Sequence, residues 1–320
     1  MAKLTRLIEN VVATLADMRR PPATAEQRAL GERLATELRA ISASGAVGTQ
    51  TEFWRAKCAA LCAAIETSDP IEFMRWPPVG ATMVGRTTLK GVIPYWRLRR
   101  SGAWRRVWRK ALRRPNFGHP PPFLVAPWTD AVAVQHAYHL LAFEQSTGQS
   151  FIDADTIVDI GGGYGSMARI VHALGFRGSY VIFDQPPVLA LQRYYLGLHG
   201  IAAVDADSGD AVGAPVVLCR SIEQVTRSLT RPGRTRLSLL STWALSEMPL
   251  ELRLQLEPLL QLPSCAKALL AYQTQFEGVD NRRYFTELIE RAGKSWTWQH
   301  FDMDFNPGNV YAFGVVDRRP

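Results

Sequence analysis

The chain has 320 residues, a net charge of +8 and 47% hydrophobic residues. This length and composition predict a globular protein with one large domain or two. No run of about 18 uncharged apolar residues occurs, which excludes a predicted transmembrane helix. Charged residues interrupt the N-terminal segment, so we expect no secretory signal. The four cysteines show no CxxC spacing. They are therefore predicted to be buried or idle thiols in a reducing cytoplasm rather than zinc ligands.

Charge divides the chain into two parts. Residues 1–120 hold 21 Lys and Arg against 9 Asp and Glu, whereas residues 121–320 hold 16 against 20. Such asymmetry marks a candidate domain boundary. We predict a helical and basic accessory region at 1–125 and a ligand-binding domain at 126–320.

The first part of the chain is predicted to be mainly helical. Apolar residues at three-and-four spacing indicate helices at 5–18, 25–41 and 52–66. Residues 67–125 are rich in Pro, Gly, Arg and Trp and are expected to be irregular, with Pro94 outside any regular element. A long helix is predicted over 128–144, with Thr129 as its N-cap.

Strands and helices alternate from residue 156 onward. Strands are predicted at 156–160, 179–184, 215–219, 236–241 and 266–273, and helices at 166–174, 187–198, 250–260 and 281–292. This alternation indicates a parallel sheet with right-handed crossovers. Strand-like runs at 296–302 and 309–316 flank Asn306-Pro307-Gly308, a turn signal, and predict a closing antiparallel hairpin. The predicted fold class is α/β, a Rossmann-like sheet with a terminal hairpin after a helical N-terminal region.

A glycine-rich turn, defined here as residues 161–165, follows the first predicted strand. Glycines let a ligand approach the backbone, and the next helix offers free N–H groups to a carboxylate. Dinucleotide sites have a third glycine where this chain has Ser166. The G-x-G-x-G spacing after Asp159 is instead the form that binds S-adenosyl-L-methionine. Its predicted ligands are Asp159, Gly161, Gly162, Gly163, Tyr164 and Gly165; the alternative is a tight turn without a ligand.

A second set of donor-binding residues is expected at the ends of the following strands. Asp184 ends the second strand and suits ribose hydroxyls, although it could instead serve as an N-cap. Topology alone places Ser221 and Ile222 near an adenine ring. Gln185 and Ser241, which lie in the segments discussed next, complete the predicted set.

Several segments resemble the sugar O-methyltransferases of bacterial polysaccharide and glycolipid gene clusters, within the class I methyltransferases. The matching stretches are 136–139, 159–165, 183–186, 194–196, 241–248 and 273–284. The resemblance spans residues 116–316; residues 1–115 match no family. It implies an S-adenosylmethionine-dependent O-methyltransferase with a sugar or glycolipid acceptor. Residues 239–248 are also similar to plant-type O-methyltransferases, but Ser241-Thr242-Trp243 stands where those enzymes have their histidine base.

Methyl transfer to a hydroxyl requires a base beside the acceptor. Glu247, near the end of the fourth strand, is the first candidate, with a favourable helix N-terminal charge as the alternative. His139 is the second candidate; with His136 it lies on the helix before the first strand, where a structural role is the alternative. The close acidic pairs Asp205/Asp207 and Asp302/Asp304 lack further ligands, so no metal site is predicted.

Residues 95–114 contain nine basic side chains, several tryptophans and no acid. This pattern suits an anionic membrane surface, an anionic glycan or nucleic acid, or a solvated helix whose tryptophans pack on the core. Nucleic acid is disfavoured because no recognised RNA-binding module precedes the catalytic half. A cytoplasmic location is predicted, and peripheral contact with the inner face of the membrane remains open. Competing interpretations are a methyltransferase for RNA or another small molecule, and a non-catalytic Rossmann-like binding module; the oligomeric state is not indicated.

Overall fold

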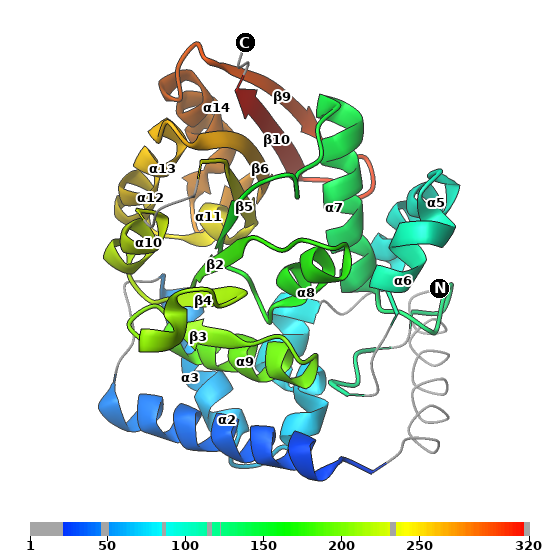
Figure 1. Cartoon of the computed structure of the whole chain (residues 1–320), viewed down its shortest axis with the longest axis vertical. Helices are drawn as coiled ribbons and strands as arrows, with labels where there is room; N and C mark the ends of the chain where they lie inside the picture. The colour runs from blue at the N-terminus through cyan, green and yellow to red at the C-terminus, as the bar shows by residue number, and fades with distance from the viewer. Residues whose placement is uncertain are drawn as a thin grey trace.

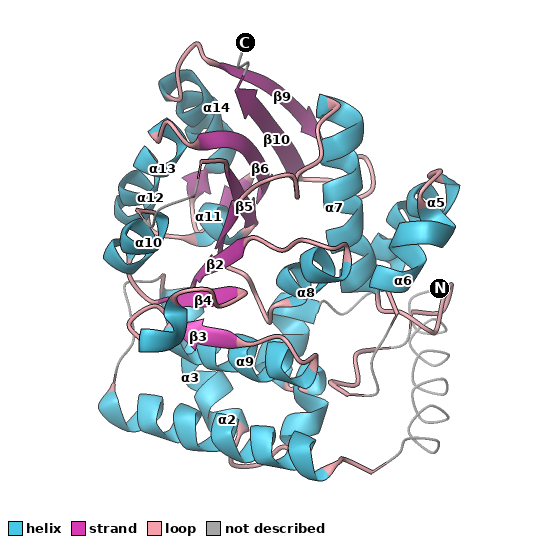
Figure 2. Ribbon diagram, viewed as in Figure 1, coloured by secondary structure: helices cyan, strands magenta, loops and turns pink. Residues whose placement is uncertain are grey.

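The computed structural model describes residues 22–45, 51–84, 88–113, 117–121, 123–230 and 235–316. The helix predicted at 5–18 lies outside the described residues. An eight-stranded sheet in the order β3-β4-β2-β1-β5-β6-β10-β9 forms the centre (Figure 2). Its strands are β1 Thr156–Ile160, β2 Ser179–Phe183, β3 Ala203–Asp205, β4 Val216–Cys219, β5 Leu237–Thr242, β6 Cys265–Gln273, β9 Trp296–Asp302 and β10 Asn309–Val316. A separate two-stranded ribbon pairs β7 Gln275–Phe276 with β8 Val279–Asp280.

Strand direction follows the sequence prediction. The strands from β3 to β6 pair in parallel, whereas β10 runs antiparallel to both β6 and β9. The predicted terminal hairpin is therefore confirmed. β1 lies between β2 and β5, so the strand order reverses beside it, and crevices form at the carboxyl ends of strands at such a point. The sequence prediction missed the short edge strand β3.

Helices cover both faces of the sheet, because alternate strand residues point to opposite sides. One face packs against α7 Ala131–Thr147, α8 Ser166–Ala173 and α9 Pro186–Leu198. The other packs against α10 Ile222–Leu229, α12 Leu250–Leu256, α13 Pro258–Gln261 and α14 Asn281–Arg291 (Figure 1). Ile157 and Val158 of β1 illustrate the alternation, since each belongs to a different one of these two cores.

Two N-terminal helices pack against the first of these layers. They are α2 Ala25–Ser44, whose capping box joins Thr24 and Gln27, and α3 Glu52–Ala64. Both confirm the sequence prediction. Leu34 and Leu38 of α2 are buried in the same core as the residues of α9, and α2 lies alongside α9 in Figure 1. The division of the chain at residue 125 remains a prediction.

The expectation of an irregular segment at 67–125 was wrong. The described part of this segment forms short helices: η1 Pro70–Arg75, α4 Pro77–Val79, η2 Gly80–Val84, η3 Thr88–Gly91, α5 Val92–Arg100, η4 Trp104–Trp108 and α6 Arg109–Ala111. Pro94 lies in the first turn of α5. Proline is tolerated there because the first N–H groups of a helix have no intrahelical acceptor.

Three smaller expectations also need correction. Asp130, not Thr129, caps α7, and its side chain accepts a hydrogen bond from Ala133 N at 2.8 Å. The helix predicted at 250–260 is divided into α12 and α13, with Pro258 starting the second. The sequence prediction missed α10 and the short helix α11 Ala244–Glu247. Within the described residues, no helix is both long and apolar enough to span a bilayer.

Candidate functional site

The glycine turn links β1 to α8 through backbone conformations that favour glycine. Gly161, Gly163 and Gly165 have φ of 75°, 55° and 97°. A Cβ on Gly161 would lie 2.0 Å from the Cβ of Ala244, whereas a Cβ on Gly163 would meet nothing within 4 Å. Gly161 therefore lets β1 and the segment after β5 approach closely, and Gly163 borders open space. Gly165 is the N-cap of α8 and provides no side-chain acceptor for the first N–H groups of that helix.

Two carboxylates lie beside this turn. Asp159 Oδ2 accepts a hydrogen bond from the Tyr180 hydroxyl at 2.7 Å. Asp184 accepts from Gln185 N and from Gln192 Nε2, each at 2.8 Å, and Gln192 also donates to Gly163 O. Burial raises the pKa of both Asp159 and Asp184 to about 7. Within the described residues neither carboxylate has an ion-pair partner, so the arrangement suits a cationic or hydroxyl-bearing ligand.

Both carboxylates line a cavity of 670 Å³ at the carboxyl ends of the central strands. This volume is in the range of small-molecule and cofactor sites. The predicted donor-binding residues in its wall are Asp159, Gly161, Gly162, Gly163, Tyr164, Asp184 and Gln185. The structure therefore brings together the residues of the first two strand ends.

Glu247, the predicted base, lines the same cavity from the end of α11. Its Oε2 accepts a hydrogen bond from Trp54 Nε1 at 2.8 Å, and its Oε1 accepts from Gln273 Nε2 at 3.1 Å. Burial raises the pKa of Glu247 to about 7, although both hydrogen bonds act in the opposite direction. A carboxylate with a pKa near the working pH is matched to proton transfer. Glu277 adds a smaller raising effect on this pKa.

Comparisons with known proteins show no family for this chain. No family model matches the chain, and no curated protein matches it. Three similar solved structures are methyltransferases. The ribosomal protein L11 methylase from Lactobacillus delbrueckii subsp. bulgaricus has 12% identity and a TM-score of 0.37, with 57% of this chain and 79% of that chain covered. The 16S rRNA methyltransferase RmtF in complex with S-adenosyl-L-homocysteine has 9% identity and a TM-score of 0.37, with 92% and 100% covered. The precorrin-6y C5,15-methyltransferase from Geobacter metallireducens GS-15 has 16% identity and a TM-score of 0.35, with 58% and 88% covered.

The fold is a Rossmann-like α/β fold with a mostly parallel central sheet. The strand order reverses at β1, and the sheet ends in an antiparallel hairpin whose last strand, β10, lies between β6 and β9. The resemblance to sugar O-methyltransferases concerns the acceptor, which the fold alone does not identify.

The structure places His139 outside the cavity wall. Its ring is fully buried, and Nδ1 contacts the Tyr311 hydroxyl. Burial lowers the pKa of His139 well below its ordinary value. His136, one turn earlier on α7, does line the cavity, and burial with a contribution from Arg169 lowers its pKa to about 4. His136 is therefore neutral at physiological pH.

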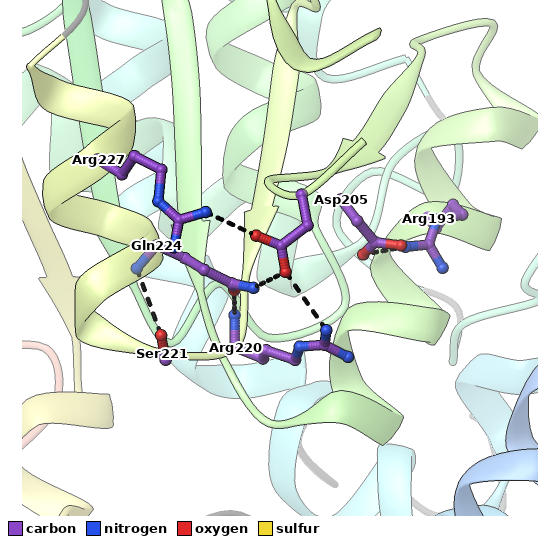
Figure 3. Close-up of polar contacts among 7 residues, drawn as sticks. Arg193, Asp205, Arg220, Ser221, Gln224 and Arg227 are labelled. Carbon is purple, nitrogen blue, oxygen red and sulfur yellow. Dashed lines mark hydrogen bonds and ion pairs between the residues drawn. The ribbon is translucent and has the colours of Figure 1, made fainter. Parts of the chain in front are cut away.

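Ser221, Ile222, Ser241 and Gly165 also lie outside the wall of the cavity. Ser221 is the N-cap of α10 and accepts a hydrogen bond from Gln224 N at 3.3 Å. Figure 3 shows it near Gln224, Arg220 and Arg227. All three of these side chains donate hydrogen bonds to the carboxylate of Asp207. Ser241 Oγ donates to Ile160 O and accepts from Leu245 N, so it joins β5 to β1. Each of these hydroxyls has a structural partner.

Two tryptophans of the site were not foreseen from the sequence. Trp54 lies in the first turn of α3, 193 residues before its partner Glu247, and no local motif marks it. Trp243 has a φ of 68°, an unfavourable conformation for a bulky residue, and its Nε1 donates to Asn309 Oδ1 at 2.6 Å. Such backbone strain concentrates at functional sites. The only sequence signal for Trp243 was its place in the segment that resembles O-methyltransferases.

Among the described residues, no group of three or more His, Cys, Asp and Glu side chains is arranged to hold a metal ion. The acidic pairs noted in the sequence have other partners. Asp205 pairs with Arg193, Asp207 with Arg220 and Arg227, Asp302 with Arg282, and Asp304 with Arg97. The metal-free site stays a prediction.

Proposed function

We propose that this chain is an S-adenosylmethionine-dependent methyltransferase that transfers the methyl group to a hydroxyl of a sugar or glycolipid acceptor. One observation supports it above all: a single cavity contains both the glycine turn with its two carboxylates and Glu247. The glycine turn and its two carboxylates suit the binding of a methyl donor, and Glu247 suits the removal of a proton from the acceptor. Fold likeness plays no part in this choice of acceptor.

The residues of the cavity fit the methyl donor by charge. S-adenosylmethionine carries an ammonium and a sulfonium, and Asp159 and Asp184, which ionise at about pH 7, have no cationic partner among the described residues. In the proposed role Asp159 holds the amino group and Asp184 holds ribose hydroxyls. The first N–H groups of α8 suit the carboxylate. Gln192 ties Asp184 to the turn, which keeps these groups in register.

Glu247 is assigned the role of general base. When bound, the donor supplies an electrophilic methyl group whose bond to sulfur breaks with both electrons staying on sulfur. As the acceptor oxygen forms its bond to carbon, its proton passes to a Glu247 carboxylate oxygen. Trp54 and Gln273 hold this carboxylate in place through one hydrogen bond to each oxygen. Each oxygen keeps a second lone pair for the acceptor hydroxyl.

The choice of a sugar acceptor is supported by the chemistry of the remaining wall. It combines amide side chains, Gln135, Gln273 and Asn306, with the rings of Trp54 and Trp243. Amides hydrogen-bond hydroxyl groups, and aromatic faces stack on sugar rings. RNA is the second candidate, favoured by the basic residues at 95–114.

A transfer assay with labelled donor tests this proposal across oligosaccharides, glycolipids and RNA. Label in a saccharide that is lost in Glu247→Gln, with S-adenosylhomocysteine affinity unchanged, is the expected result. Glu251→Gln is the matched control, because Glu251 is exposed on α12 four residues further along. If only RNA becomes labelled, RNA replaces the sugar as the proposed acceptor. Full turnover by Glu247→Gln would show that Glu247 is not the general base.

A further inference from the structure

The helices α5, η4 and α6 present a surface rich in unpaired positive charge, here called the basic face. It comprises exposed side chains: Arg99, Arg100, Arg105, Arg106, Arg109, Lys110 and Arg113. Within the described ranges none of these seven forms an ion pair with a carboxylate. Arg97 is the exception in this segment, because it pairs with Asp304 and donates to the Tyr138 hydroxyl at 2.7 Å.

The backbone beneath the basic face is anchored by buried aromatic and aliphatic side chains. Tyr95, Leu98, Trp108 and Leu112 are all buried in the main core. The Tyr95 ring contacts those of Phe123 and Trp104 in edge-to-face geometry. The half-buried Trp104 therefore contributes to packing, while the neighbouring arginines are exposed to solvent. The arginines of the basic face are therefore carried by helices that are anchored to the core.

Two large apolar side chains of α5 are also exposed. Ile93 is 44% exposed and Trp96 is 42% exposed. With Arg100 they follow the i, i+3, i+7 spacing of one side of α5. The Arg99 guanidinium lies 5.1 Å from the centre of the Trp96 ring. A surface that combines cations with a protruding aliphatic and an indole side chain has the composition of an interfacial membrane-binding helix.

We propose that the basic face docks this protein onto an anionic lipid surface, with Ile93 and Trp96 inserted among the lipids. Nucleic acid would use the arginines and stack a base on Trp96, but it offers nothing to the exposed aliphatic chain of Ile93. Anionic lipids use all three features: headgroups pair with the arginines, and the acyl boundary accepts both apolar side chains.

The cavity opens near this surface. Lys90, the third residue of η3, lies two positions before α5, is exposed and lines the cavity wall. A lipid-anchored acceptor would reach the cavity from the docked face, and this link alone rests on the proposed function. The docking itself is measured without any transfer reaction, so its failure is distinguishable from failure of the enzyme.

Vesicle sedimentation with the full chain tests the docking. The protein should bind phosphatidylcholine vesicles that contain phosphatidylglycerol, and should not bind vesicles of phosphatidylcholine alone. Arg105→Glu/Arg106→Glu should weaken the binding by more than about tenfold, because each basic residue near the surface contributes separately. Arg28→Glu/Arg33→Glu makes the same change in net charge on α2, at exposed positions elsewhere, and should leave the affinity within about twofold if only the local charge matters.

The apolar contribution needs its own variant. Ile93→Ser/Trp96→Ser should weaken vesicle binding while leaving its salt dependence unchanged, since both are exposed and no charge is removed. Absence of vesicle binding, equal binding to uncharged vesicles, or an equal loss in the α2 variant would overturn the proposal. So would binding to single-stranded RNA that excludes vesicles, which would assign the face to nucleic acid.

Discussion

Trp54→Phe removes one hydrogen bond from Glu247 and retains an aromatic ring in the cavity wall. The indole Nε1 lies 2.8 Å from Glu247 Oε2, and this bond lowers the pKa of a carboxyl that burial raises to about 7. A hydrogen bond to a charged group contributes about 1.5–3 kcal/mol. We use the lower end, because water in the cavity can replace the indole in part. At about 1.4 kcal/mol per pKa unit, the pKa should rise by about one unit.

The consequence for turnover depends on pH. With the pKa near 7, about half of Glu247 is ionised at pH 7; a rise of about one unit leaves about a tenth. The variant should therefore lose about fivefold in kcat/KM at pH 7 and recover most of it above about pH 9. A pH profile of kcat/KM measures this shift directly.

Two further variants control this experiment. Gln273→Leu removes the other donor to Glu247, so it should shift the profile in the same direction. Phe53→Leu changes the neighbouring ring, which packs on Phe276 and gives no side-chain hydrogen bond to Glu247, so its profile should keep the wild-type pKa. An unchanged apparent pKa in Trp54→Phe, or an equal loss at every pH, would refute the reasoning.

Three other predictions concern the cavity and its supports. Burial raises the pKa of Asp159 to about 7, so the folded state binds more protons than the unfolded state between about pH 4 and 7 and loses stability as pH rises through that window. Asp159→Asn should thus raise the free energy of unfolding of the ligand-free protein at about pH 8 by about 1–4 kcal/mol, seen as a higher Tm, and weaken S-adenosylhomocysteine binding. A lower Tm with retained binding would contradict it. Gly161→Ala should lower the free energy of unfolding by about 2–4 kcal/mol in denaturant unfolding, because of its contact with Ala244 and its φ of 75°. Gly200→Ala, with a φ of 69° and open space around it, should lower it by only about 1–2 kcal/mol. Equal losses would exclude an effect of the steric contact. His139→Ala should lower stability by about 2–4 kcal/mol while the folded protein keeps its donor affinity; turnover lost at an unchanged Tm would restore His139 as a catalytic candidate.

Local patterns were enough to predict the sheet and the first half of the site. Asp159, the glycine turn and the start of α8 are continuous in sequence, and the burial of β1 makes its strand pattern plain. Asp184 follows the next buried strand in the same way. Because parallel strands present their carboxyl ends at one edge of the sheet, the positions of these residues after consecutive strands were enough to predict that they lie close together.

The second half of the candidate site, around Glu247, depends on contacts between distant residues that no local sequence pattern shows. Trp54 reaches Glu247 because α3 packs against α9, and that packing is set by buried side chains of residues far apart in sequence. His139 and His136 differ by one turn of α7, yet only His136 faces the cavity. Helical spacing puts both on neighbouring positions but does not give the rotation of the helix.

The segment at 67–125 shows a different limit. Its prolines suggested loops, yet Pro94 is accommodated in the first turn of α5, where proline does little harm. Propensity identified the residues that interrupt helices and not the short helices between them. Burial of Tyr95, Leu98 and Trp108 stabilises those helices in the folded chain.

Isothermal titration calorimetry with S-adenosylhomocysteine tests the central claim most directly. The wild-type protein should bind one equivalent, and more tightly as the pH rises through about 7, because Asp159 and Asp184 then ionise. Binding should be lost in Asp184→Asn/Asp159→Asn, while NAD should give no heat with either protein. Absence of S-adenosylhomocysteine binding by the wild-type protein, or preferential binding of NAD, would contradict the assignment of this cavity to a methyl donor.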